Sequence, residues 1–323
     1  MSGLRPHARR PLVALLVWVV ATALIVLVFR AVGWTRVTDI GARIDPAWLV
    51  IALCGNLAIQ PLAAIQWRLL LPRGQHIRLR KMLSITALGS LAMNTVPALM
   101  GHASVVMLLA RQPGMCHGTA LSVLALEQLT EAIAKVTVVL LAIVVLPVPD
   151  WMRQGAIVLA CGAALFLTAM IVAAQRHDVV ARWAAKSPAR SLMSFAARWT
   201  DRLETLRTPR RFLAALLACL AMKLVEGLAI IATQHALGVD LPASSAILVL
   251  AAAGFGTMLP LAPGNLGTYE AAVILAYKWL GVPTGDAVAL AIVQHLAYLA
   301  ASTGAGYAVL SLRQIRAWRV ARG

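Results

Sequence analysis

The sequence has 323 residues, of which 61% are hydrophobic and only 13% are charged. Soluble domains carry roughly 25% charged residues, so this composition excludes an ordinary soluble domain. The formal net charge is +17, yet the basic residues lie mostly at the ends of apolar segments, where membrane topology and anionic lipid headgroups explain them. We therefore expect an integral membrane protein whose partners are membrane lipids, anionic headgroups included, and not nucleic acid.

Six apolar stretches reach the ~20 residues that a helix needs to cross about 30 Å of hydrocarbon. They cover residues 11–29, 47–67, 119–146, 155–174, 212–233 and 287–312. The first exceeds the roughly 7–15 apolar residues of a signal peptide, so we interpret it as a retained anchor. The sequence predicts an all-α integral membrane protein, a polytopic helix bundle with about six full crossings.

Basic residues gather in five places that the positive-inside rule assigns to the cytoplasm. These are the N-terminus, residues 68–81, Arg111, a block from Arg176 to Arg211, and the arginines from Arg313 onward. The block either lies on the inner leaflet as an amphipathic helix or forms a solvated loop. Arg30, Arg36 and Arg43 would then lie outside, against the rule.

Two further apolar segments, residues 82–112 and 244–281, fit this charge pattern only if each turns back within the membrane. The first contains LAMNTVPALMGH and the second GTMLPLAPGNLGTYE. Proline interrupts a helix and glycine permits a tight reversal. Irregular backbone at membrane depth must be buried in protein or line a wet cavity, so we expect two re-entrant helical hairpins that face each other.

The hairpins share a proline followed four residues later by a glycine: Pro97 and Gly101, and Pro260 and Gly264. One hairpin would enter from the inside and the other from the outside. Residues 1–323 would then form a single domain whose halves, 1–146 and 151–312, are an inverted repeat. Such repeats usually hold their substrate between the halves, near the bilayer midplane.

Twelve residues are candidate substrate-binding residues, because each is a polar or turn-forming residue expected to face the interior or the cytoplasmic boundary. They are Arg68, Asn94, Arg111, Glu127, Glu131, Pro263, Gly264, Asn265, Gly267, Glu270, Gln294 and Tyr298. Isolated cysteines without CxxC spacing indicate neither a disulfide framework nor a zinc site. We expect no metal and no cofactor.

Glu127, Glu131 and Lys135 share one stripe of a crossing helix, where buried charge is costly and commonly functional. If Glu131 pairs with Lys135 to hold helices together, Glu127 remains to contact a cationic headgroup or carry a proton. Lys223 and Glu226 are expected to neutralise each other.

The remaining candidates each keep two interpretations. Glu270 either caps the returning helix of the second hairpin or lies beside amides, near Gly264 and Gly267, that receive a phosphate oxygen. Arg68 and Arg111 either bind a lipid phosphate or mark the membrane boundary. The polar residues Asn94, Gln294, His295 and Tyr298 either face the cavity or hydrogen-bond between helices.

Together these residues resemble the flippase-like transmembrane domain of the lysylphosphatidylglycerol synthase family. The resemblance spans nearly the whole chain and rests on Trp67 with Arg68, the first turn with Arg111 after it, EQLTE from Glu127, and above all PLAPGNLGTYE from Pro260. The first turn departs from the family, which is usually richer there in glycine and acidic residues.

The resemblance implies a bundle with two re-entrant hairpins that moves polar lipids between the leaflets of the bacterial inner membrane, with both chain ends cytoplasmic. Stand-alone relatives are associated with lysylphosphatidylglycerol, hopanoids or polyprenyl-linked sugars. Because only a short basic tail follows the last helix, the aminoacyl-transferase domain is not expected, and neither is synthesis of lysylphosphatidylglycerol. A homo-oligomer is compatible with this arrangement.

Two other function classes remain open. A polyprenyl-pyrophosphate phosphatase also combines inverted hairpins with a Glu-x-x-x-Glu helix, but this chain has Asn265 and Thr268 where that class has Ser-Arg-Ser. A passive scaffold would leave intramembrane carboxylates unexplained. We therefore expect a transporter and not an enzyme, and the lack of a phosphate-binding loop indicates that ATP is not its direct energy source.

Overall fold

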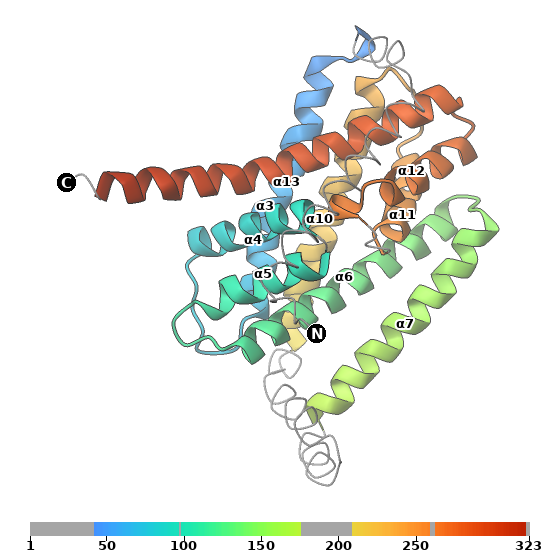
Figure 1. Cartoon of the computed structure of the whole chain (residues 1–323). Helices are drawn as coiled ribbons and strands as arrows, with labels where there is room; N and C mark the ends of the chain where they lie inside the picture. The colour runs from blue at the N-terminus through green and yellow to red at the C-terminus, as the bar shows by residue number, and fades with distance from the viewer. Residues whose placement is uncertain (1–41, 97, 176–208, 259–261, 321–323) are drawn as a thin grey trace, which may run out of the picture. The chain divides into compact units, whose positions relative to one another are not determined.

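The computed structural model describes residues 42–96, 98–175, 209–258 and 262–320, and over these ranges it consists of helices and connecting turns (Figure 1). The helices are α3 (Pro46–Leu70), α4 (Leu79–Thr95), α5 (Ala98–Ala110), α6 (His117–Val145), α7 (Asp150–Gln175), α10 (Pro209–Ala236), α11 (Ser245–Gly256), α12 (Thr268–Trp279) and α13 (Thr284–Val320). A 3-10 turn, η2 (Pro263–Asn265), precedes α12. The all-α prediction is confirmed.

Within the described ranges, five helices are long and apolar enough to cross a membrane: α3, α6, α7, α10 and α13. They coincide with the predicted crossings from 47–67 onward. The first predicted crossing, 11–29, lies outside the described residues, as do nearly all of the basic block and both Pro97 and Pro260.

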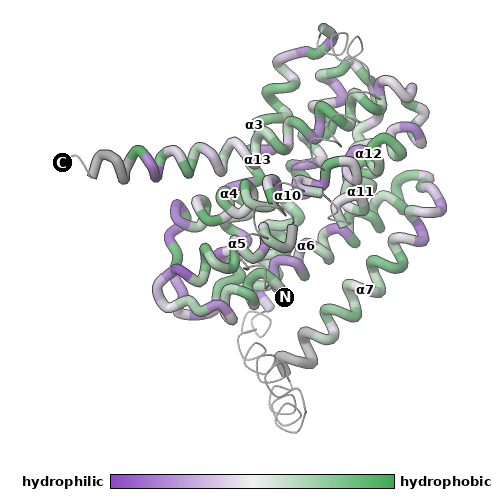
Figure 2. Tube along the Cα trace, in the orientation of Figure 1, coloured by the Kyte–Doolittle hydropathy of each residue, from purple (hydrophilic) through white to green (hydrophobic). Residues whose placement is uncertain are grey.

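The outward surfaces of these helices are apolar. Val144 is 83% exposed, and Val158 and Leu165 of α7 are each 73% exposed. Figure 2 shows hydrophobic residues along the length of α7, with hydrophilic residues at helix ends and turns. In water such a surface would be unfavourable, whereas lipid tails match it, so the chain is a multi-pass membrane protein.

The four remaining helices form two helical hairpins. The first hairpin consists of α4 and α5, and the second of α11 and α12. The longest of these arms, α4, has 17 residues and extends about 26 Å at 1.5 Å per residue, and the others are shorter. None matches the hydrocarbon thickness of about 30 Å. The predicted helix breaks are confirmed, whereas the membrane face from which each hairpin enters remains a prediction.

Glycine allows the two arms of each hairpin to approach closely. A Cβ atom on Gly101 of α5 would lie 2.7 Å from the Met93 Cα atom of α4. A Cβ atom on Gly256 of α11 would lie 2.6 Å from the carbonyl oxygen of Thr268, at the start of α12. Real Cβ atoms do not approach other atoms so closely, so each hairpin requires glycine at this position.

Tertiary contacts divide the chain into two units. Unit 1 comprises Met1–Leu57, Leu88–His102 and Gly227–Gly323, and unit 2 comprises Ala58–Ala87 and Ala103–Glu226. Helices α3 and α10 contribute a segment to each unit. The turn of the first hairpin and the whole second hairpin belong to unit 1. The units do not follow the two sequence halves, and the inverted repeat remains a prediction.

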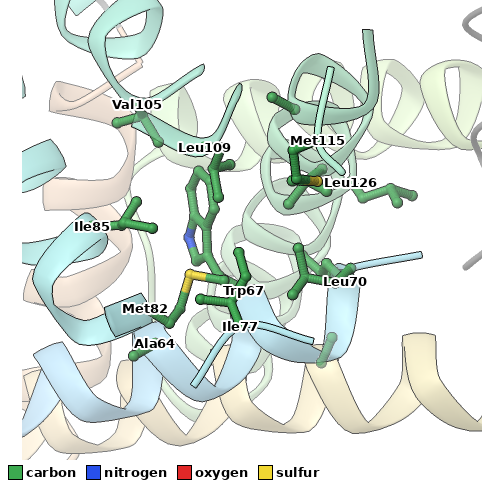
Figure 3. Packing of buried hydrophobic residues seen from close by; sticks show 14 of the residues in the cluster. Ala64, Trp67, Leu70, Ile77, Met82, Ile85, Val105, Leu109, Met115 and Leu126 are labelled. Carbon is green, nitrogen blue, oxygen red and sulfur yellow. The ribbon is translucent and has the colours of Figure 1, made fainter. Parts of the chain in front are cut away.

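The buried side chains of the two units differ in size. In unit 2, large side chains gather around the indole of Trp67, with Met82 of α4 and Leu109 of α5 among them (Figure 3). In unit 1, α12 packs against α11 and α13, and buried alanines are frequent, such as Ala252 and Ala291. Because lipid tails are as apolar as leucine, close contact between small residues is what stabilises such helix pairs.

The close approach at Gly256 predicts a selective effect of an added methyl group. We expect Gly256→Ala to lower the free energy of unfolding by about 1–3 kcal/mol, because the backbone at Thr268 must shift. Gly285→Ala is the matched control, since nothing lies within 4 Å of its Cβ position. Thermal unfolding in detergent measures both variants. Equal melting temperatures for the two would contradict the tight packing of α11 on α12.

Candidate functional site

One stripe of α13 carries contacts to the turns of both hairpins. His295, Leu299 and Ser302 are spaced i, i+4 and i+7, and therefore share a helix face. The His295 Nδ1 atom lies 2.7 Å from Glu270 Oε1 at the start of α12. Leu299 contacts the turn of the second hairpin, and Ser302 accepts a hydrogen bond from the first. All of these residues lie in unit 1.

The two hairpin turns meet beside this stripe. A Cβ atom on Gly264 would lie 3.2 Å from Leu299 Cδ2 and 3.5 Å from the carbonyl oxygen of Asn94. The Asn94 amide group donates to Ser302 Oγ at 2.8 Å and to Thr303 Oγ1 at 3.1 Å. The turns of the two helical hairpins therefore lie side by side, whereas a re-entrant course of either hairpin in the membrane remains a prediction. Asn94 forms the helix-to-helix hydrogen bonds that were one of its two interpretations.

The turn of the second hairpin has an irregular backbone that is buried in protein. Gly264 has a φ of 60°, Asn265 a φ of 56° and Gly267 a φ of 88°. Asparagine tolerates this left-handed region better than other residues with a side chain do. Pro263 and Gly264 are buried, and Asn265 is half-buried. This burial meets the requirement for non-helical backbone at membrane depth.

Glu270 caps α12, which was one of its two predicted roles. The Gly267 amide donates to Glu270 Oε2 at 2.7 Å, which is one half of a capping box, because Gly267 has no side chain to form the other half. The Asn265 amide donates to the carbonyl oxygen of Ala262 at 3.0 Å. The Gly267 amide, expected to be available for a phosphate oxygen, is therefore already engaged. An anion at this turn would have to compete with the Glu270 carboxylate.

A buried chain of polar side chains extends from Glu270 and His295 through unit 1. The ring of Tyr269 stacks on His295 with centroids 4.1 Å apart, and the Tyr269 hydroxyl accepts a hydrogen bond from Gln294. The Tyr277 hydroxyl donates to Gln294 Oε1 at 3.1 Å. Gln234 of α10 connects Tyr277 to Ser245 at the start of α11. Polar groups thus link the base of the second hairpin to its turn.

Unit 2 contains a compact group of four charges, which we call the ion quartet. It consists of Glu131, Lys135, Lys223 and Glu226. Lys223 Nζ lies 2.9 Å from Glu131 Oε1 and 3.1 Å from Glu226 Oε2, while Lys135 lies 3.6 Å from Glu131. Cys219 donates to Glu131 Oε2 at 3.4 Å. With two charges of each sign, the quartet is neutral, as stable burial in a membrane requires.

Glu127 lies one turn before Glu131 on α6 and outside the quartet. Its Oε2 atom accepts a hydrogen bond from the adjacent Gln128 at 2.8 Å. Among the described residues, no lysine, arginine or histidine lies within 4 Å of its carboxylate. The expectation that pairing at Glu131 leaves Glu127 as the additional carboxylate therefore agrees with the geometry.

The other candidates occupy separate positions. Arg68 in the last turn of α3 and Arg111 just after α5 are exposed and belong to unit 2. Tyr298 is half-buried on α13, and its ring lies 6.4 Å from that of His295. Unit 1 thus brings together Asn94, Pro263, Gly264, Asn265, Gly267, Glu270, Gln294 and Tyr298. Unit 2 contains Arg68, Arg111, Glu127 and Glu131.

Sequence reasoning did not select several of the connecting residues. Tyr269, Tyr277, Gln234 and Ser302 each complete a buried contact in unit 1. The isolated amide of Gln234 within an apolar helix was a usable signal. Tyr269 and Tyr277 lie eight residues apart on one face of α12, which was a second signal. Over the described ranges, no group of three or more potential metal-ligating side chains was found.

A comparison with protein families gave one match. The model described as "Lysylphosphatidylglycerol synthase TM region" matches residues 12–306, which include both hairpins and every candidate site residue. Comparisons with curated proteins and with solved structures gave no match.

The ion quartet predicts a defined pattern of loss and rescue. We expect Lys223→Met to lower the free energy of unfolding by about 3–5 kcal/mol, because Glu226 loses its ion-pair partner. Adding Glu226→Gln should restore most of this loss, because a neutral Glu131 and Lys135 pair then remains. Thermal unfolding in detergent measures both. A double variant as unstable as the single one would show that the charges are not coupled.

Proposed function

This chain belongs to the family of the lysylphosphatidylglycerol synthase TM region, and from that membership we propose that it is a flippase. It moves a polar lipid, such as an aminoacyl-phospholipid, a hopanoid or a polyprenyl-linked substrate, between the leaflets of the bacterial inner membrane. Its partners are membrane lipids, including those with anionic headgroups.

The meeting of two short hairpins on one face of α13 is the observation that carries this proposal. Their arms fall short of the hydrocarbon thickness, yet their turns contact each other through Gly264 and Asn94. The contacts lie at Leu299 and Ser302, near the middle of α13 (Thr284–Val320). If α13 crosses the membrane, the turns lie near the bilayer midplane, where transporters with broken helices hold their substrates.

We propose that the hairpins enter from opposite faces and that both chain ends are cytoplasmic. The base of the first hairpin carries Arg78, Arg80, Lys81 and Arg111, which favours the cytoplasmic side. The second hairpin connects directly to the start of α13, whose C-terminal end carries arginines such as Arg313. A cytoplasmic C-terminus therefore places the base of the second hairpin on the outer side.

Headgroup recognition then has two parts in this proposal. Arg68 and Arg111 are exposed near the cytoplasmic boundary, where a guanidinium group can bind a lipid phosphate with two hydrogen bonds. Glu127 provides a carboxylate for a cationic group, because the quartet lysines are already paired with Glu131 and Glu226. We propose transport and not catalysis, since Glu131, the second carboxylate of the phosphatase-like pattern, is held by Lys223 and Lys135.

Leaflet exchange in proteoliposomes tests the proposed function. Acyl-labelled phosphatidylglycerol, lysylphosphatidylglycerol and undecaprenyl phosphate are followed for exchange, and undecaprenyl pyrophosphate for phosphate release. We expect exchange without phosphate release. Glu127→Gln should slow exchange of lysylphosphatidylglycerol at least about tenfold, the equivalent of about 1.4 kcal/mol, because a neutral amide cannot hold its cationic group. Asp150→Asn, at the start of α7, is the control and should behave as wild type. Phosphate release without exchange would overturn the flippase in favour of the phosphatase.

Cysteine labelling tests the orientation of the hairpins. In a background without native cysteines, we expect Gly285→Cys, next to the base of the second hairpin, to react with a membrane-impermeant maleimide in intact cells. Ser187→Cys, within the basic block, should react only after the membrane is permeabilised. Labelling of residue 187 in intact cells would contradict the proposed topology.

A further inference from the structure

The pair formed by Glu270 and His295 has no part in the headgroup recognition proposed above, although among the described residues of unit 1 it is the most deeply buried ion pair. His295 is 2% exposed and Glu270 is 8% exposed, and their nearest atoms are 2.7 Å apart. Helix capping explains one oxygen of Glu270, which accepts from the Gly267 amide. It does not explain why the other oxygen meets a histidine at membrane depth, where ionisable groups are costly and commonly functional.

We propose that this pair is a proton-binding site that couples lipid movement to the proton gradient, an inference that rests on the proposed flippase function. With one proton shared, the pair is neutral overall, either as carboxylate with imidazolium or as carboxylic acid with imidazole. Removing that proton leaves a carboxylate beside a neutral ring, and adding a second leaves an imidazolium beside a neutral acid. Each change places a net charge in a buried site, so the proton count is fixed while water is excluded.

Among the described residues, no third charged side chain forms an ion pair with Glu270 or His295. Tyr269 stacks on the His295 ring and Tyr298 lies beyond it. Helix α11 carries no ionisable side chain, and on α12 the nearest lysine, Lys278, is exposed near the far end. The turn of the first hairpin adds only His102. The proton balance of the buried site is therefore set by Glu270 and His295.

The hairpin turns meet within two helical turns of the pair along α13. Leu299, whose Cδ2 atom would lie 3.2 Å from a Cβ atom on Gly264, follows His295 by one helical turn on the same face of α13, about 6 Å along the axis. Asn94 holds the first hairpin against Ser302, one further turn along. Movement of a lipid headgroup past the turns requires them to separate, and separation admits water to the pair. An anionic headgroup beside the open pair favours a second proton on it, because imidazolium beside carboxylic acid then neutralises the headgroup. The pair releases that proton when the headgroup leaves on the other side, and the empty pair returns with one proton, so one proton moves with each anionic lipid.

A steady-state experiment measures this coupling directly. The protein is reconstituted with each of the three acyl-labelled lipids named above, and potassium with valinomycin holds the membrane potential at zero. If one proton moves per lipid, a gradient of one pH unit should shift the leaflet ratio of a transported lipid about tenfold. Inverting the gradient should invert the shift.

Two variants assign the site. Glu270→Gln keeps a residue type that serves the same capping position but cannot exchange a proton, and His295→Gln removes the second partner. Each single variant leaves one titratable group, so the double variant Glu270→Gln/His295→Gln is also made, and this double variant should still exchange lipid with a leaflet ratio near one at any pH gradient. His235→Gln is the matched control, because this histidine of unit 1 is exposed at the end of α10, and it should retain the tenfold shift.

The outcomes separate this inference from the proposed function. If the wild-type protein exchanges lipid but the leaflet ratio does not depend on the pH gradient, proton coupling is wrong and the proposed flippase function stands. A tenfold shift that persists in the double variant would overturn the assignment to Glu270 and His295. If none of the three lipids is exchanged at any pH gradient, the proposed flippase function is contradicted, and so is its coupling to protons. The wild-type ratio decides the coupling even if a variant fails to fold.

Discussion

The structure depends on one constraint: inside a bilayer, every peptide group that leaves a helix must find its hydrogen bond or its burial within the protein. The second hairpin leaves helical geometry between α11 and α12, with three residues in the left-handed region. Side chains and neighbouring backbone compensate for this break. Glu270 accepts from the Gly267 amide, and Pro263 and Gly264 are enclosed by protein. The same constraint explains why the first hairpin turn lies against it, since each turn shields the other.

Buried charged side chains in this protein, like its buried peptide groups, are compensated by neighbouring groups of the protein. The four members of the ion quartet neutralise one another in unit 2, and Glu270 meets His295 in unit 1. Each group of charges can therefore be buried without a net charge. Glu127 departs from this pattern, and it is the residue through which we propose that unit 2 recognises its ligand. A residue that does not follow the pattern of the rest of the structure is a candidate functional residue.

The extent of the helices could be predicted from the sequence because apolar length, the charge pattern and the positions of proline and glycine together indicate where a helix runs on and where it breaks. The described crossings and both helix breaks agree with that reasoning. The partners of the polar residues could not be predicted in the same way. Spacing placed Glu131 beside Lys135 on α6, but its shorter contact is to Lys223 on another helix. Capping was one of two interpretations that the position of Glu270 allowed, whereas its contact with His295 requires the packing of α12 on α13.

The quartet has a consequence for how the chain is made. Glu127, Glu131 and Lys135 all lie on α6, while Lys223 and Glu226 lie on α10, which the ribosome completes only after α7. When α6 leaves the translocon, Glu131 has only Lys135 as a counter-ion. That pair is already neutral, and so is the pair of Lys223 with Glu226 on α10, so each helix can enter the membrane without a net charge from the quartet. The 2.9 Å contact between Lys223 and Glu131 then joins an early helix to a late one, and unit 2 gains this contact only once α10 has been synthesised.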